Sequence, residues 1–71
     1  MFKKNYRVMI VAENIARAME VVSEVGIKDM AVRPSLIEDS NGVEHSVYVA
    51  EFKASEKKFE KFCSNLNCVV L

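Results

Sequence analysis

The 71-residue chain has few of the residues that usually mark a catalytic or metal site. It has one histidine, two cysteines and no tryptophan, and its only glycines are Gly26 and Gly42. Two cysteines cannot ligate a four-cysteine iron–sulfur cluster, and Cys63 and Cys68 lack the spacing of a zinc site. The chain also has no glycine-rich phosphate loop. We therefore predict no metal, no cofactor and no catalytic residue, and two buried, reduced cysteines.

The sequence also lacks a net charge and long apolar runs. Ten Lys and Arg balance ten Asp and Glu, so the basic excess that favours nonspecific nucleic-acid binding is absent. The apolar run over 8–12 is too short for the core of a signal peptide. No stretch approaches the ~20 apolar residues of a membrane span. These features predict a cytoplasmic protein that does not contact a membrane.

The length predicts one domain over residues 1–71. A domain of this size buries only about 60% of the surface of its unfolded chain. Apolar residues nevertheless make up 51% of the sequence. We therefore expect part of the apolar surface to be buried against a partner.

A β-hairpin over residues 30–53 is the clearest local feature. Asn41-Gly42 separates two runs rich in β-branched residues, which is the pattern of a hairpin with a two-residue type I′ turn. This turn would place Ser40 opposite Val43. Because Pro34 has no amide hydrogen to donate, we predict that the first strand of the hairpin lies at a sheet edge.

Two helices and two further strands flank this hairpin. The predicted elements are a strand at 5–12, a helix at 15–25, strands at 30–39 and 43–53, a helix at 56–65 and a strand at 67–71. Gly26 is suited to end the first helix, and Ser55 is suited to cap the second. The β-α-β-β-α-β order predicts an α+β, ferredoxin-like sandwich. Its four-stranded antiparallel sheet would have the order 4-1-3-2, with two helices on one face.

The face of this sheet that the helices leave open is the predicted binding surface. With the register counted from a type I′ turn, this face combines apolar, arginine and aromatic side chains, which are enriched in interface cores. The predicted binding face consists of Arg7, Met9, Val11, Arg33, Tyr48 and Phe52. The alternative is that the strand side chains point to the opposite faces from those predicted, or that a loop covers this predicted binding face.

We predict a small non-enzymatic interaction or regulatory protein, of the inhibitor or adaptor type. It would bind another macromolecule, with a protein as partner, and would form a homodimer. Fold alone does not determine function. The prediction therefore depends on the composition of the open face and on the absence of a catalytic constellation.

Two alternatives remain open at this stage. RNA-recognition modules share the element order and stack bases on aromatic residues of the first and third strands, so a single-stranded RNA-binding module is one alternative. The third strand lacks the basic residue and the aromatic spacing of their motif, which leaves only Tyr48 and Phe52 for stacking. The other alternative is an enzyme whose site forms between two subunits and uses His45 or Tyr48.

Overall fold

The computed structural model describes residues 3–66 and 68–71. Its elements are β1 (Lys4–Val11), a 3₁₀ turn (Ala12–Asn14), α1 (Ile15–Val25), β2 (Ala31–Glu38), β3 (Glu44–Ala54), α2 (Glu56–Leu66) and β4 (Val69–Val70). This is the order that the sequence predicts, and each element boundary differs by two residues or fewer. Of the strand predicted at 67–71, only Val69–Val70 is β4, and Asn67 lies outside the described residues.

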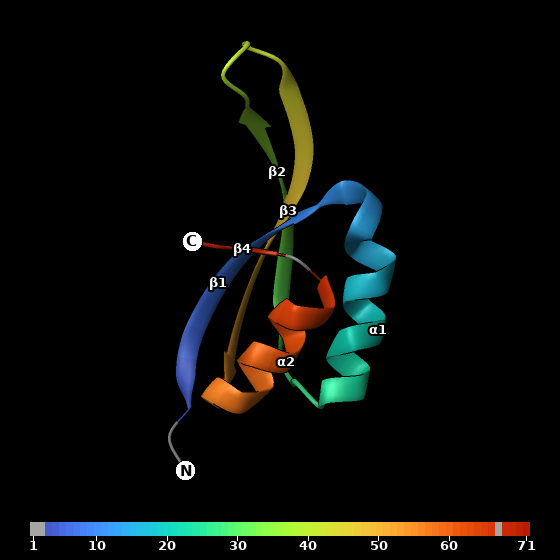
Figure 1. Cartoon of the computed structure of the whole chain (residues 1–71), viewed down its shortest axis with the longest axis vertical. Coiled ribbons are helices and arrows are strands. Elements are labelled where there is room, and N and C mark those ends of the chain that lie inside the picture. The colour runs from blue at the N-terminus through green and yellow to red at the C-terminus, as the bar shows by residue number, and fades with distance from the viewer. Residues whose placement is uncertain (1–2, 67) are drawn as a thin grey trace.

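The four strands form one antiparallel sheet of order β2-β3-β1-β4 (Figure 1). This is the predicted order, read from the opposite edge. β2, which contains Pro34, lies at an edge as predicted. The predicted α+β class, with an open four-stranded antiparallel sheet and two helices, is therefore confirmed.

Both helices pack on the side of the sheet to which the even-numbered strand residues point. Side chains alternate along a strand, so every second residue of β1 and β3 reaches this side. The buried core consists of Val8, Ile10, Ala18, Val21, Ile27, Ala50, Phe52, Ala54, Phe62 and Leu66. Phe62 is fully buried, and its ring centroid lies 5.2 Å from that of Phe52. One sheet face and the inner sides of both helices thus share a single core.

The ends of the helices are fixed by local hydrogen bonds. Gly26 follows α1 with a φ of 83°, and the amides of Gly26 and Ile27 both donate to the carbonyl of Val22. Only glycine adopts this left-handed conformation at little cost, which explains why α1 ends there. At the start of α2, the Ser55 hydroxyl accepts a hydrogen bond from the Lys58 amide, as a capping residue does.

The loop of the β2–β3 hairpin is one residue longer than the sequence predicts. The Asp39 amide donates to the carbonyl of Val43, and the Gly42 amide donates to the carbonyl of Asp39. Gly42 has a φ of 79°, but Asn41 does not have the positive φ that a type I′ turn requires. Instead, one carboxylate oxygen of Asp39 accepts hydrogen bonds from the amides of Asn41 and Val43. The prediction of a two-residue type I′ turn is therefore wrong.

This longer loop reverses which β3 side chains face the helices. Asp39, not Ser40, lies opposite Val43, so the pairing of β2 with β3 is shifted by one residue. A shift of one residue moves every side chain of a strand to the other face. Tyr48 and Phe52 consequently pack against the core. Their predicted place on the open face is wrong.

The β2–β3 hairpin extends beyond the helices and makes the molecule elongated (Figure 1). The molecule measures 43 × 21 × 19 Å. Every residue from Arg33 to Ser46 is exposed. We call residues 36–46 the hairpin arm. Within it, Leu36 and Val43 expose 62% and 52% of their surface. The arm is the part of the sheet that no helix covers on either side.

Candidate interaction surface

The face of the sheet opposite the helices is the candidate site, and we call it the open face. Strand pairing and side-chain alternation place on it Asn5, Arg7, Met9, Val11, Ala31, Arg33, Ser35, Ile37, His45, Val47, Val49, Glu51, Lys53, Val69 and Leu71. Four of the six predicted binding residues, Arg7, Met9, Val11 and Arg33, are among them. Val47 is the one of these open-face residues that is fully buried, with 1% exposure. The sequence prediction omitted Val49, because it depended on the wrong hairpin register, and Val69, because a two-residue strand gives no alternation to count.

An apolar row crosses the middle of the open face. Met9 of β1 pairs with Val49 on one side and with Val69 of β4 on the other. Val69 is 52% exposed, and the nearby Val11 and Leu71 are 42% and 59% exposed. Neighbouring exposed aliphatic side chains of this kind mark interaction surfaces more often than isolated ones do. The row gives the open face an apolar centre in which Val69 is exposed and Met9 and Val49 are partly exposed.

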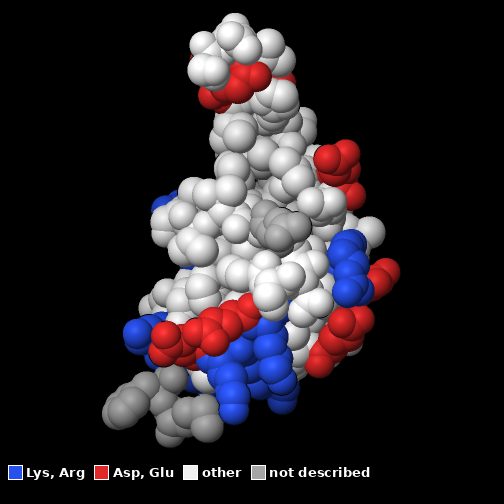
Figure 2. All heavy atoms as spheres, in the orientation of Figure 1, with Lys and Arg blue, Asp and Glu red and all other residues white. Residues whose placement is uncertain are grey.

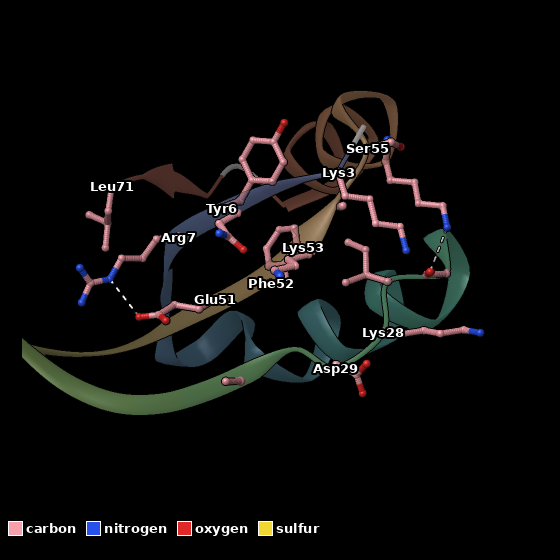
Figure 3. A pocket seen from close by; sticks show the side chains of 16 residues that line it. Lys3, Tyr6, Arg7, Lys28, Asp29, Glu51, Phe52, Lys53, Ser55 and Leu71 are labelled. Atoms are coloured by element: carbon pink, nitrogen blue, oxygen red, sulfur yellow. Dashed lines mark hydrogen bonds and ion pairs between the residues drawn. The ribbon is translucent and has the colours of Figure 1, made fainter. Parts of the chain in front are cut away.

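A charged group lies beside this apolar row. The Glu51 carboxylate is 3.3 Å from Nε of Arg7 and 3.2 Å from a terminal nitrogen of Arg33. Figure 3 shows the Arg7 side chain directed at Glu51. All three side chains are at least half exposed, so each ion pair contributes at most about 1 kcal/mol. The open face therefore presents both positive and negative groups next to its apolar centre.

A cavity of about 1050 Å³ lies at the end of the sheet that is remote from the hairpin arm (Figure 3). It forms because β2 begins at Ala31, opposite Glu51, whereas β3 continues to Ala54. The last residues of β3 thus have no β2 neighbour, and the loop before β2 borders the gap. In that loop Asp29 has a φ of 58°, so the chain turns away before it can extend the strand.

The charged residues that line the cavity are mostly basic. Five cationic side chains and two carboxylates face it: Lys3, Arg7, Lys28, Lys53 and Lys58, with Asp29 and Glu51. We call Lys3, Lys28, Lys53 and Lys58 the basic end. Lys58 donates to the carbonyl of Gly26 at 3.1 Å and so has a structural role at the end of α1. In Figure 2, lysine and arginine side chains lie over the body of the molecule together with acidic side chains, whereas the only charged side chains at the far tip are acidic.

The open face lacks the aromatic side chains that base stacking requires. Among the described strand residues, none of those that point to this face is Phe or Tyr. Tyr48 is half-buried and Phe52 is buried, and both contact the core. The RNA-binding alternative depended on these two rings, so the arrangement removes its main support.

His45 lies on the hairpin arm, opposite Ile37. Its Nε2 atom is 2.9 Å from the second carboxylate oxygen of Asp39. The contact with His45, followed by the amides of Val43 and Asn41, lowers the pKa of the Asp39 carboxyl below its ordinary value. This pair is exposed and belongs to the hydrogen bonds of the loop, which gives His45 a structural role.

Cys63 and Cys68 are free thiols whose sulfur atoms lie 3.1 Å apart. Both are half-buried, so they are less buried than predicted. Burial, and then the contact with Cys68, raise the pKa of the Cys63 thiol to about 12. Across the described residues, no group of three or more His, Cys, Asp or Glu side chains is arranged to hold a metal ion.

Neither α1 nor α2, the helices of the described chain, has the length and apolar character needed to cross a membrane.

A scan against protein-family models finds no match, and searches of curated proteins and of solved structures find none either. The open face and the cavity must therefore be interpreted from their own residues.

Proposed function

We propose that this chain is a small, non-enzymatic interaction protein of ferredoxin-like architecture, and that its open face packs against a second copy of the chain. The apolar row of Val69, Met9 and Val49, in which Val69 is 52% exposed and the other two are partly exposed, carries this proposal. Burial of apolar surface is the main favourable term in most protein association. The dimer would act as an inhibitor or adaptor by binding a further protein through surfaces that remain accessible.

The open face has the features that a two-fold interface requires. In such an interface the same patch is used by both copies, so it must be complementary to itself. A central apolar row can pack on its own copy. Beside it, Glu51 of one subunit can face an arginine of the other, because both signs are present on the face.

Sedimentation equilibrium across a wide concentration range tests this proposal. We expect the wild type to form a dimer and the Met9→Glu variant to dissociate about 100-fold more readily, because the variant places a charge in the apolar row. Met19→Glu is the matched control, since Met19 is 50% exposed on α1, outside the open face. A wild type that stays monomeric at every concentration would contradict the proposal, as would equal weakening by both variants. Circular dichroism shows whether each variant is folded.

A further inference from the structure

A groove lies on the helix side of the β2–β3 hairpin, at the base of the hairpin arm. It forms because β1 ends at Val11, opposite Val47, and the chain then turns into α1, whereas β2 and β3 stay paired as far as Glu38 and Glu44. The sheet thus continues where the layer of helices stops, as Figure 1 shows. The groove has a volume of about 460 Å³ and is lined by Ala12, Pro34, Ser35, Leu36, Ser46, Val47 and Tyr48.

The side chains that point into this groove are mostly apolar. Pro34 lies opposite Tyr48, and Leu36 lies opposite Ser46, all at even-numbered positions in phase with the buried Ala50. Leu36 is 62% exposed, the highest value among the exposed large hydrophobic residues of the described chain. Tyr48 is half-buried. The groove therefore has an apolar floor that is accessible to a partner.

Two carboxylates continue the groove toward the end of the arm. Glu38 lies two residues beyond Leu36 on the same side of the sheet, and Glu44 lies directly opposite Glu38. Both side chains are exposed, and neither makes an ion pair within the described residues. Like charges placed directly opposite each other destabilise a strand pair. A cation placed between these two carboxylates would relieve that repulsion.

The segments that form the groove supply no such cation. The sequence has no Lys or Arg between Arg33 and Lys53 or between Arg7 and Arg17. In Figure 2 the only charged side chains at the far tip are acidic. We call Glu38, Asp39 and Glu44 the acidic tip. The charge of this region is complementary to a basic partner and repels nucleic acid.

We infer that the groove binds a cationic, amphipathic helix of a partner protein. Apolar side chains of that helix would pack on Leu36 and Tyr48, and a Lys or Arg would lie between the two glutamates of the groove. This inference rests on the proposed interaction function, because it names the surface and the chemistry of the further protein. It does not require the open-face dimer, since the groove lies on the opposite side of the sheet.

The dimensions of the groove match one helix. Two adjacent strands lie about 5 Å apart, so with their side chains they present a face about 10 Å wide, which is the diameter of a helix. Leu36 and Glu38 are about 7 Å apart along β2. In a helix that runs along the strands, this distance corresponds to about four residues, which lie on one side of that helix. The partner helix would therefore carry its cation about one turn from an apolar residue.

The free edge of β2 is unsuited to the addition of a partner strand. Hydrogen-bonded and non-hydrogen-bonded residue pairs alternate along an antiparallel ladder. Because the Asp39 amide donates to the carbonyl of Val43, the odd-numbered residues of β2 direct their amides to β3, and the even-numbered residues direct theirs to the free edge. Pro34 is even-numbered and has no amide hydrogen. It interrupts the edge, which favours a partner on the face of the hairpin.

Fluorescence anisotropy with two synthetic peptides tests this inference. One is an 18-residue helix of Leu and Lys with leucine along one side, and the other has Glu in place of every Lys. We expect the Lys peptide to bind at least tenfold more tightly and to lose affinity as the salt concentration rises. Equal binding of the two peptides, or no binding of the Lys peptide to the folded protein, would overturn the inference.

The Met9→Glu variant separates this result from the proposed dimer. Met9 lies on the open face, so the variant should bind the Lys peptide with the affinity of the wild type. Sedimentation equilibrium reports the dimer independently. A dimer that does not bind the Lys peptide overturns only the present inference, and a monomer that binds it overturns only the proposed dimer.

A pair of substitutions on β2 tests the apolar contact. Leu36→Ser should weaken binding of the Lys peptide about tenfold, because it removes an exposed apolar side chain from the groove. Ile37→Ser is the matched control, since Ile37 is its neighbour and points to the open face. Equal effects of the two variants would overturn the inference. Dissociation of the dimer by Leu36→Ser would assign the groove to a second copy and would overturn it as well.

Charge neutralisation tests the polar contact. Glu38→Gln, Glu44→Gln should weaken binding of the Lys peptide about tenfold and reduce its dependence on salt. Glu20→Gln, Glu24→Gln is the matched control, since it removes two exposed carboxylates from α1. Equal effects of the two double variants would show that the peptide responds only to the total charge of the chain, and that result would overturn the inference.

Discussion

The two sides of β3 show how one strand serves two purposes. Ala50 and Phe52 point to the helices and are almost completely buried, with exposures of 0% and 4%. Their neighbours Val49, Glu51 and Lys53 point the other way and are half-buried or exposed. The same alternation produces both sets, and the helices cover only the first. Val47, which points the same way as Val49, is nevertheless buried, with 1% exposure. Apolar residues on the covered side stabilise the fold, whereas the partly exposed Val49 on the other side remains available for association.

The hairpin arm extends this comparison, because it is uncovered on both sides. An isolated two-stranded hairpin is marginally stable in water. The arm continues the pairing of β2 with β3, and the Asp39 carboxylate closes its loop. We therefore expect substitutions to have their largest effect on the covered side of the sheet and smaller effects toward the tip of the arm.

The largest expected effect comes from a pair of substitutions on β3. Phe52→Ala removes a buried ring and should lower the free energy of unfolding by about 3–5 kcal/mol. Val49→Ala should lower it by about 1 kcal/mol in the monomer, because Val49 is only half-buried. Urea denaturation at concentrations that keep the protein monomeric measures both. Equal costs would mean that Val49 contributes to the core, contrary to the observed register.

Gly42→Ala probes the uncovered arm. Gly42 has a φ of 79°, which costs a residue with a side chain about 1–2 kcal/mol. A Cβ atom there would lie 3.5 Å from a carboxylate oxygen of Glu38, an ordinary contact, so the cost arises from the backbone and not from crowding. Urea denaturation should show this loss, and Ser40→Ala in the same loop is the control. If Gly42→Ala did not change the free energy of unfolding, the hairpin arm would not unfold together with the rest of the chain.

The alkylation rate of Cys63 tests the side of the sheet that the helices cover, and this test does not require a measurement of unfolding. Because the thiolate is the reactive form, a Cys63 pKa near 12 should make alkylation at pH 8 at least tenfold slower than in the urea-unfolded chain. Cys68→Ala removes one cause of the raised pKa and should accelerate the reaction of Cys63. Alkylation of Cys63 at the unfolded rate would show that its side of the sheet is open to solvent.

The smallest expected effect concerns the pH dependence of the arm. The pKa of Asp39 is lowered in the folded state, so its contribution to stability is complete above its ordinary pKa near 4 and disappears as the pH falls through the folded value. Asp39→Asn should therefore be less stable than the wild type at pH 7, and the difference should narrow on acidification. Urea denaturation between pH 7 and pH 3 measures this. A difference that stays constant with pH would assign the effect to a cause other than ionisation.

The sequence predicted the secondary structure well because the signals are local. Gly26 ends α1 and Ser55 caps α2, as expected from residues suited to these positions. The edge position of β2 follows from the missing amide hydrogen of Pro34. The order of elements then restricts the topology, so the strand order was also predicted.

The binding face was predicted only in part, because it depends on the hairpin register. Arg7, Met9 and Val11 lie in a strand whose phase does not depend on the turn, and they are on the open face. Tyr48 and Phe52 follow the turn, and one additional loop residue moved both to the other side. The Asp39 carboxylate, which accepts two amide hydrogen bonds, was the available signal for the longer loop.

The sequence by itself thus determined which segments form helices and strands and in what order they pair, because propensity, capping and alternation act over a few residues. Only the tertiary structure decided which side of β3 the helices cover, and that the basic cavity and the acidic tip lie at opposite ends. These features depend on strand register and on the point where β2 begins, which result from contacts between distant parts of the chain.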